Sequence, residues 1–224
     1  MAAQAVPASI PTEIAAITST SPNLLVADIR GNIHALNRSF DVVRSWLAYT
    51  NGRATHMIAR NGILITFGEE ESSLMPLLKV WNLDSKDKKS GAPTLLRSVK
   101  VQHGNRPHPI SCLALTNNLS HLAVGLADGT VLLYRHISSS LQSSTSLTSF
   151  PKPRVIHESP SDSVTGLGFR EISDEGSPIN LFIVTLSRTL VYVASPKGSA
   201  SNATAVDEVG CDLGCTTMDW HKRR

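Results

Sequence analysis

The sequence is poor in aromatic residues, charged residues and cysteines. Phe, Trp and Tyr make up 5% of its 224 residues, and Asp, Glu, Lys and Arg make up 17%, against roughly 25% in an average soluble protein. The net charge is only 21 − 18 = +3, and the basic residues are scattered, so we expect no nucleic-acid partner. Three cysteines are too few for a disulfide scaffold, and we expect reduced thiols.

Long apolar runs are also missing. The densest run, residues 181–186, has the length of a strand, whereas a membrane span needs about 18 consecutive apolar residues. The first residues lack the basic segment and apolar core of a secretory signal. We therefore expect a cytoplasmic protein that contacts membranes only peripherally, through other proteins.

Motifs of enzymes and metal sites are absent as well. The sequence contains no G-x-S-x-G elbow, no phosphate-binding G-x-x-x-x-G-K-[ST] loop and no G-x-G-x-x-G. Cys211 and Cys215 form a C-x₃-C pair, but the second pair of a usual zinc site is missing. We expect no catalytic residue, no cofactor-binding residue and no metal ligand.

What the sequence does contain is a repeated β-rich unit. Its clearest copy covers residues 109–136 and has three apolar strands. A turn at Asp128-Gly129 separates the last two, and the pair predicts a type I′ turn, which needs positive φ at both central positions. Residues 24–36 align without a gap on residues 122–134, which brings Gly31 onto Gly129.

Further copies cover residues 63–84 and 163–195, and a fifth begins at 209–220. Polar, low-complexity segments near 85–93, 138–153 and 196–206 predict surface loops between strands. The segment 39–49 has spacing that suits a helix or a strand, and the repeats favour the strand. For the same reason we expect a first strand within residues 13–19.

These units predict an all-β fold, a WD40-like β-propeller of about four blades with the start of a fifth. A blade takes about 40–45 residues, so seven would need about 280. We therefore expect an incomplete propeller over residues 13–224, behind a disordered tail at 1–12. An unpaired sheet edge would be a liability, which leads us to expect a fragment.

Two charged sets are candidate partner contacts. Glu69, Glu70 and Glu71 lie where the copy at 63–84 predicts an expanded loop, residues 68–76. A second set, in the next connector, consists of Lys86, Lys88 and Lys89. The alternative is that both sets are solvated loop charges.

Several motifs, taken in order, resemble the N-terminal propeller of the vacuolar protein sorting-associated protein 11 family. They are AAITSTSPNLLVADIRGNIHAL at 15–36, LLKVWNLD at 77–84, VTGLGFR at 164–170 and EVGCDLGCTTMD at 208–219. The family's aromatic-rich first strand is missing here, as are the further blades, the α-solenoid and the zinc-binding RING domain that follow in the family.

The resemblance implies a non-enzymatic subunit of the class C core of the HOPS and CORVET tethering complexes. Such a subunit works at endosome and vacuole membranes, with Rab GTPases and the SNARE machinery as indirect partners. Two alternatives stay open at this point. One is a ligand-binding or catalytic propeller of unknown substrate, since a fold does not fix a function. The other is a non-functional truncated product.

Overall fold

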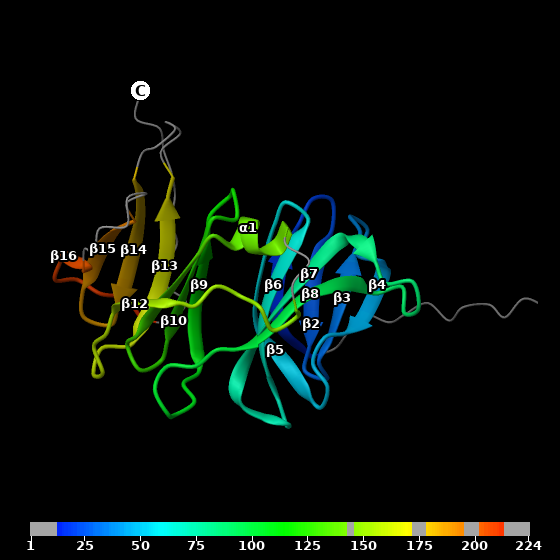
Figure 1. Cartoon of the computed structure of the whole chain (residues 1–224), viewed down its shortest axis with the longest axis horizontal. Helices are drawn as coiled ribbons and strands as arrows, with labels where there is room; N and C mark the ends of the chain where they lie inside the picture. Colours follow the sequence, from blue (N-terminus) through cyan, green and yellow to red (C-terminus); the bar gives the residue numbers. More distant parts are fainter. Residues whose placement is uncertain (1–12, 143–145, 172–177, 195–201, 213–224) are drawn as a thin grey trace, which may run out of the picture. The chain divides into compact units, whose positions relative to one another are not determined.

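Sixteen strands account for nearly all regular structure in the computed structural model, which describes residues 13–142, 146–171, 178–194 and 202–212. They form four antiparallel sheets of four strands, each a meander of consecutive strands (Figure 1). This is the blade architecture of a β-propeller, as the repeats predict. The chain divides into two compact units of two sheets each, residues 1–107 with 146–148 and the remainder.

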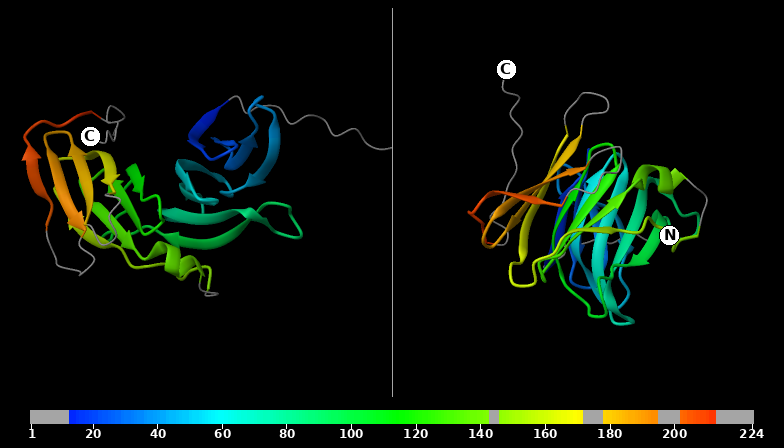
Figure 2. Two further views of the ribbon diagram at one scale, coloured as in Figure 1. Left: turned by 90° about the horizontal axis from the view of Figure 1, so that it is seen from above. Right: turned by 60° about the vertical axis from the view of Figure 1, so that its left-hand side comes forward.

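The first unit contains two sheets with strand orders β1-β2-β3-β4 and β5-β6-β7-β8. Their strands are β1 (Ile14–Ser19), β2 (Leu24–Asp28), β3 (Asn32–Leu36), β4 (Val42–Leu47), β5 (Gly52–Arg60), β6 (Ile63–Glu70), β7 (Ser73–Lys86) and β8 (Pro93–Lys100). The strands β7 and β8 form a long hairpin (Figure 2). Both β1 and β4 confirm the strands expected at residues 13–19 and 39–49.

The second unit contains the other two sheets, with strand orders β9-β10-β11-β12 and β13-β14-β15-β16. Its elements are β9 (Ile110–Leu115), β10 (His121–Leu126), β11 (Val131–Arg135), α1 (Ile137–Gln142), β12 (Arg154–His157), β13 (Val164–Arg170), β14 (Ile179–Thr185), β15 (Thr189–Ala194) and β16 (Thr204–Asp207).

Each unit has its own apolar core. In the first, one cluster joins residues of both sheets and includes Leu25, Ile33, Leu64 and the two tryptophans Trp46 and Trp81. In the second, a cluster around Ala123, Val131, Leu181 and Ile183 does the same. Burial of apolar area at about 25 cal/mol per Å² is what holds the faces of neighbouring sheets together.

The aligned repeats have the same register. Ala27 pairs with Ile33 in the first sheet, and the aligned residues Gly125 and Val131 pair in the third. The turn at Asp128-Gly129, however, is not type I′. Among its residues only Gly129 has a positive φ, of 86°, and the amide of Leu126 donates to the carbonyl of Thr130. This is a three-residue loop that ends on a left-handed glycine.

The type I′ geometry occurs instead at Asn61-Gly62, where both φ values are positive, 48° and 72°. This turn joins β5 to β6, with Arg60 opposite Ile63. The repeated unit expected at residues 63–84 begins after this turn, so the turn and β5 were not predicted. Neither were β8 and the four-residue strand β12.

Several other expectations need correction. The expanded acidic loop at 68–76 does not exist, because β6 and β7 pair almost to their ends and Glu70 lies opposite Ser73. The segment 138–153 contains most of α1, anchored by the fully buried Ile137. The segment 196–206 contains the start of β16, which pairs with β15.

The expected tail at residues 1–12 lies outside the described residues, as does most of the fifth unit at 209–220. Its first part, residues 209–212, is described and follows β16 without forming a strand. There the amide of Cys211 donates to the carbonyl of Thr185 at the end of β14.

Candidate functional site

The acidic set lies at the tip of the β6–β7 hairpin. Glu69 and Glu70 are the last residues of β6, and Glu71 begins the two-residue turn before β7. Glu70 and Glu71 have partners from the segment just before β5. The Glu70 carboxylate accepts the amide of Thr50 at 3.2 Å, and Glu71 accepts the side-chain amide of Asn51 at 3.3 Å.

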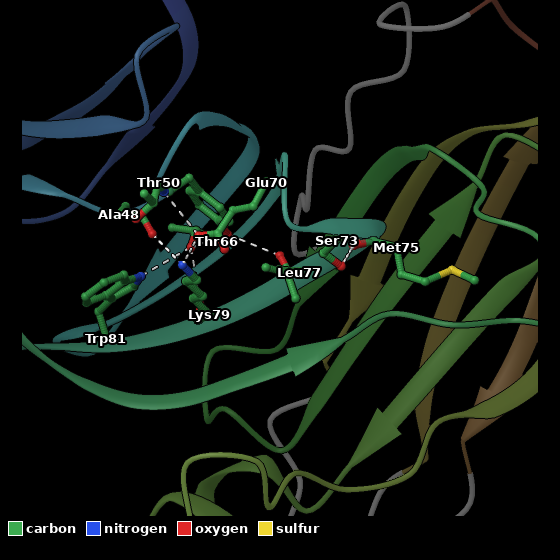
Figure 3. Close-up of polar contacts among 10 residues, drawn as sticks. Ala48, Thr50, Thr66, Glu70, Ser73, Met75, Leu77, Lys79 and Trp81 are labelled. Atoms are coloured by element: carbon green, nitrogen blue, oxygen red, sulfur yellow. Dashed lines mark hydrogen bonds and ion pairs between the residues drawn. The ribbon is translucent and has the colours of Figure 1, made fainter.

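Glu70 is a partly buried charge with a partly buried counter-charge. Its Oε1 lies 2.5 Å from Nζ of Lys79, and the two side chains are only 13% and 12% exposed (Figure 3). Nζ of Lys79 also donates to the carbonyl of Ala48 at 2.7 Å and lies 4.5 Å from the centre of the Tyr49 ring. Glu70 is therefore a structural residue, and it is not a free solvated contact.

A buried hydrogen-bond chain runs beside this ion pair. Nε1 of Trp81 donates to Oγ1 of Thr66 at 3.2 Å, and Thr66 bonds the hydroxyl of Tyr49 at 2.9 Å (Figure 3). That hydroxyl donates in turn to the carbonyl of Leu77 at 3.2 Å. Burial raises the pKa of Tyr49 well above its usual value, so the phenol stays neutral and acts as a hydrogen-bond donor.

Glu69 and Glu71 line an open groove of about 650 Å³. Arg30, Arg53 and the exposed Leu47 line it too, and Arg53 lies 3.6 Å from Glu69. The Arg53–Glu69 pair is more than half exposed, so it adds little stability. The groove's lining contains both acids, Glu70 among them, and bases, so neither sign of charge dominates it clearly enough to favour one class of ligand.

The lysine set lies at the other end of β7. Lys86 is the last residue of this strand, and Lys88 and Lys89 lie in the turn before β8, all three exposed. Asp87 shapes the turn, because its carboxylate accepts the amides of Lys89 at 3.1 Å and Ser90 at 2.8 Å. These bonds, that of the Ser90 amide above all, lower the pKa of Asp87.

The structure therefore does not bring the two charged sets together. β7 runs from Ser73 to Lys86, and 13 steps of about 3.3 Å separate its ends by about 43 Å. If the sets contact partners, they contact them at two separate places.

Polar triads inside the first and fourth sheets hold turns. His34 contacts Ser45 through Nδ1 at 2.8 Å and Asp28 through Nε2 at 3.1 Å. Asp28 also accepts the amides of Arg30 and Asn32 in the β2–β3 turn. Although burial acts in the opposite direction, these hydrogen bonds lower the pKa of Asp28. The three side chains contact one another in the sequence Ser–His–Asp, as in the catalytic triad of a hydrolase. Here, however, the aspartate accepts the backbone amides of a turn.

Asp162 has the same role before β13. It accepts the hydroxyls of Thr185 at 2.7 Å and Ser187 at 2.6 Å, and these bonds lower its pKa against the effect of burial.

No cluster of three or more His, Cys, Asp or Glu side chains suited to a metal ion occurs among the described residues. Cys112 is largely buried, which raises the pKa of its thiol to about 11, and a neutral thiol is a poor nucleophile. Cys215 lies outside the described part of the chain, so the C-x₃-C pair is not tested. Within the described residues, no helix has the length and apolar character needed to cross a membrane.

Sequence reasoning missed Lys79, Tyr49 and Asp162. A signal for Lys79 exists, because it is the one charged residue within the apolar run Leu77–Trp81, and a charge in such a run needs a buried partner.

Comparison with known proteins gives one family. The family description "PEP5/VPS11 N-terminal" matches residues 3–224. Proteins named vacuolar protein sorting-associated protein 11 homolog from Homo sapiens and Mus musculus are each 31% identical over 212 residues. The Dictyostelium discoideum protein of that name is 28% identical over 214 residues. The match covers 93% of this chain but 21% of the human and mouse proteins, so the chain spans about one-fifth of their length.

Solved structures are similar in fold. The β-propeller domain of Myceliophteria_thermophila Cps50 (Swd1) aligns with a TM-score of 0.53 and 13% identity, over 80% of this chain and 55% of that one. The computationally designed protein Ika8 aligns with a TM-score of 0.54 and 15% identity, over 93% of this chain and 53% of that one. At such identities the likeness concerns the fold alone.

Proposed function

The chain belongs to the PEP5/VPS11 N-terminal family, and from this premise we propose that it is a non-enzymatic interaction module in vacuolar protein sorting. The observation that carries the proposal is the family match, which extends over residues 3–224 and so includes all four blades. The sequence relatives carry vacuolar protein sorting in their names.

In this proposal the whole protein is a subunit of the class C core of the HOPS and CORVET complexes, which tether vesicles before fusion. Other class C subunits are its direct partners, and Rab GTPases and SNARE proteins act through the complex. The protein then lies at endosome and vacuole membranes without entering them. The chain contributes blades whose exposed turns carry recognition, since binding residues concentrate on loops held by a rigid scaffold.

Of the two charged sets, we propose the lysine set as the partner contact. Lys86, Lys88 and Lys89 lie at the turn between β7 and β8, which we call the lysine turn. Its three lysines are exposed, whereas Glu70 is partly buried against Lys79 and Glu69 is paired with Arg53. The turn is also a replaceable part of the fold, because β7 and β8 are paired on either side of it and Lys86 lies opposite Pro93.

Delivery of a newly made vacuolar hydrolase tests this function. Removing the protein from its own cells should divert the hydrolase out of the cell, and restoring the full-length gene should correct this. A full-length gene with residues 87–92 replaced by Gly and Ser should restore delivery only in part. Normal delivery without the protein would refute the role in sorting, and full rescue by the Gly-Ser version would refute the turn as a contact.

A further inference from the structure

The lysine turn carries an exposed serine directly after its lysines. Ser90 follows Lys88 and Lys89 in the turn between β7 and β8, and its side chain is exposed. Three of the four residues before it are lysines, in the order Lys-Asp-Lys-Lys. No other serine or threonine of the sequence has more than one Lys or Arg among the four residues before it. A cluster of basic residues and an accessible hydroxyl group therefore coincide in this turn.

The other two hydroxyl groups at this end of the hairpin are less accessible. Ser85 and Thr94 are partly buried, and their hydroxyl oxygens lie 2.9 Å apart in a hydrogen bond between the two strands. Neither has a lysine among the four residues before it. Since residues 86–91 are all exposed, an enzyme can reach Oγ of Ser90. Sequence and structure thus select the same residue.

The turn can open without unpairing the strands. The amide of Asp87 donates to the carbonyl of Ala92 at 2.8 Å, and the amide of Gly91 donates to the carbonyl of Asp87 at 2.9 Å. These bonds lie within the turn, and the outermost strand pair is Lys86 with Pro93. Exposed segments with few buried contacts open locally at a small free energy. The turn can therefore adapt to the cleft of a modifying enzyme while the sheet stays intact.

A negative group on Ser90 would change both the shape and the charge of the turn. The Ser90 hydroxyl and amide each donate to Oδ1 of Asp87 at 2.8 Å. A phosphoryl group on Oγ removes the hydroxyl donor and places negative charge beside that carboxylate. Three lysines and two aspartates give residues 84–92 a net charge of 3 − 2 = +1. A phosphoserine adds about −1.5 to −2 and so reverses the sign of this charge.

We propose that Ser90 is a phosphorylation site, modified by a protein kinase that selects basic residues before the serine. Acidic groups of such a kinase pair with Lys86, Lys88 and Lys89. The γ-phosphoryl group of ATP passes to Oγ of Ser90: the new O–P bond forms, the bond to ADP breaks, and a base of the kinase takes the hydroxyl proton. Phosphorylation then releases the partner from the lysine turn. This last step rests on the proposed function, which makes the lysines the contact.

Phosphate incorporation into the full chain tests the site. The catalytic domain of protein kinase C with Mg·ATP serves as the basic-directed kinase, and mass spectrometry of the digested chain locates the phosphate. Ser90 should be modified at least tenfold faster than Ser85, Thr94 or any other hydroxyl group. Incorporation mainly at other residues, or none at all, overturns the proposal.

Matched double variants test the role of the lysines. Lys88→Ala with Lys89→Ala should slow the modification of Ser90 at least tenfold. Lys100→Ala with Lys152→Ala removes the same charge from two exposed positions outside the turn and should have little effect. Equal rates in the two double variants would show that the lysines of the turn do not direct the kinase, and this would overturn the proposal.

The carboxyl group of Asp87 reports what the phosphate does to the turn. Hydrogen bonds from the amide and the hydroxyl of Ser90 lower the pKa of Asp87 in the unmodified chain. Phosphorylation should raise this pKa, because the hydroxyl no longer donates and the phosphate disfavours a second negative charge. Titration followed by NMR measures the change, and the pKa of Asp162 in the second unit should not move. An unchanged pKa of Asp87 would contradict the proposed effect.

The native protein provides the test in cells. Mass spectrometry of the endogenous protein should find phosphate on Ser90. In the full-length gene, Ser90→Asp should impair delivery of the vacuolar hydrolase as the Gly-Ser version does, whereas Ser90→Ala should not. The proposal fails if Ser90 is unmodified under every growth condition, or if Ser90→Asp supports full delivery while the Gly-Ser version does not.

Failure here is distinguishable from failure of the proposed function. If the Gly-Ser version impairs delivery but Ser90 receives no phosphate, only the modification site falls. If delivery is normal without the protein, the role in sorting falls, and phosphate incorporation in the purified chain still decides the assignment of Ser90.

Discussion

The partly buried ion pair of Lys79 with Glu70 links two strands of the second sheet. Taking a charge out of water is expensive, and the cost is recovered only while the partner and the accompanying hydrogen bonds are present. Lys79 has the Glu70 carboxylate, the Ala48 carbonyl and the Tyr49 ring around its ammonium group. Removing one member leaves the other partly buried without its counter-charge.

We therefore expect Lys79→Met to lower the free energy of unfolding by about 2–3 kcal/mol. The double variant Lys79→Met/Glu70→Gln should recover most of this loss, because both charges are gone. Urea unfolding followed by tryptophan fluorescence measures both. The exposed pair provides the control, since Arg53→Met should cost less than about 0.5 kcal/mol. If Lys79→Met alone and the double variant lowered the free energy of unfolding equally, Lys79 and Glu70 would not be energetically coupled.

His121 makes stability depend on pH. Burial, together with the positive charges of Arg135 and His136, lowers its pKa from 6.5 to about 4. Between these two values the unfolded chain binds a proton that the folded chain does not, so the free energy of unfolding falls as the pH drops from 6.5 to 4.

The variant His121→Gln should flatten this fall, as measured by urea unfolding at half-unit steps of pH. Below about pH 4, loss of charge at Asp28 and Asp162 destabilises the fold further, because both have lowered pKa values. A profile that is equally steep with and without His121 would contradict the assignment.

At the scale of elements, the hairpin turns at Gly31 and Gly129 each contact the segment that connects their own sheet to the following one. A Cβ atom at Gly31 would overlap the backbone carbonyl of Tyr49, and one at Gly129 would overlap that of Ser159. Both glycines also have φ near +85°, which other residues rarely adopt. The two aligned positions therefore require glycine for two independent reasons.

Gly129→Ala should cost about 2–4 kcal/mol of unfolding free energy, from backbone strain and from the overlap with Ser159. Gly104→Ala separates the two causes, because Gly104 has a φ of 63° but no atom within 4 Å of the added Cβ. Its cost should stay near 1 kcal/mol. Thermal or urea unfolding of the two variants gives the comparison, and similar costs would rule out a role for the overlap.

The sequence predicts those parts of the fold that are encoded within short segments, such as a hairpin turn or an alternating strand. The hairpins at Gly31 and Gly129 repeat visibly, and they predicted the blades correctly. The strands β5 and β12 mix charged and apolar residues without a clean alternation, so the local pattern does not predict them. The Asn61-Gly62 turn, in contrast, is a strong local signal for the hairpin of β5 and β6.

The candidate site was harder to predict because its decisive contacts are not local. Three successive glutamates predict an open, solvated loop. The strands instead remain paired, because Lys79 of the opposite strand compensates Glu70.

At the scale of the whole molecule, two units with separate cores carry four blades, and the family match extends over both. The described residues offer exposed turns and grooves but no metal cluster. Since the chain spans about one-fifth of its human and mouse relatives, its proposed role is that of one module within a larger subunit.

The most direct test of this account is affinity purification of the endogenous protein from its own cells, with an antibody raised against residues 1–224 and mass spectrometry of everything recovered. We predict that other class C vacuolar protein sorting subunits are recovered in amounts comparable to the protein itself. Recovery of the protein without any of these subunits would contradict the account.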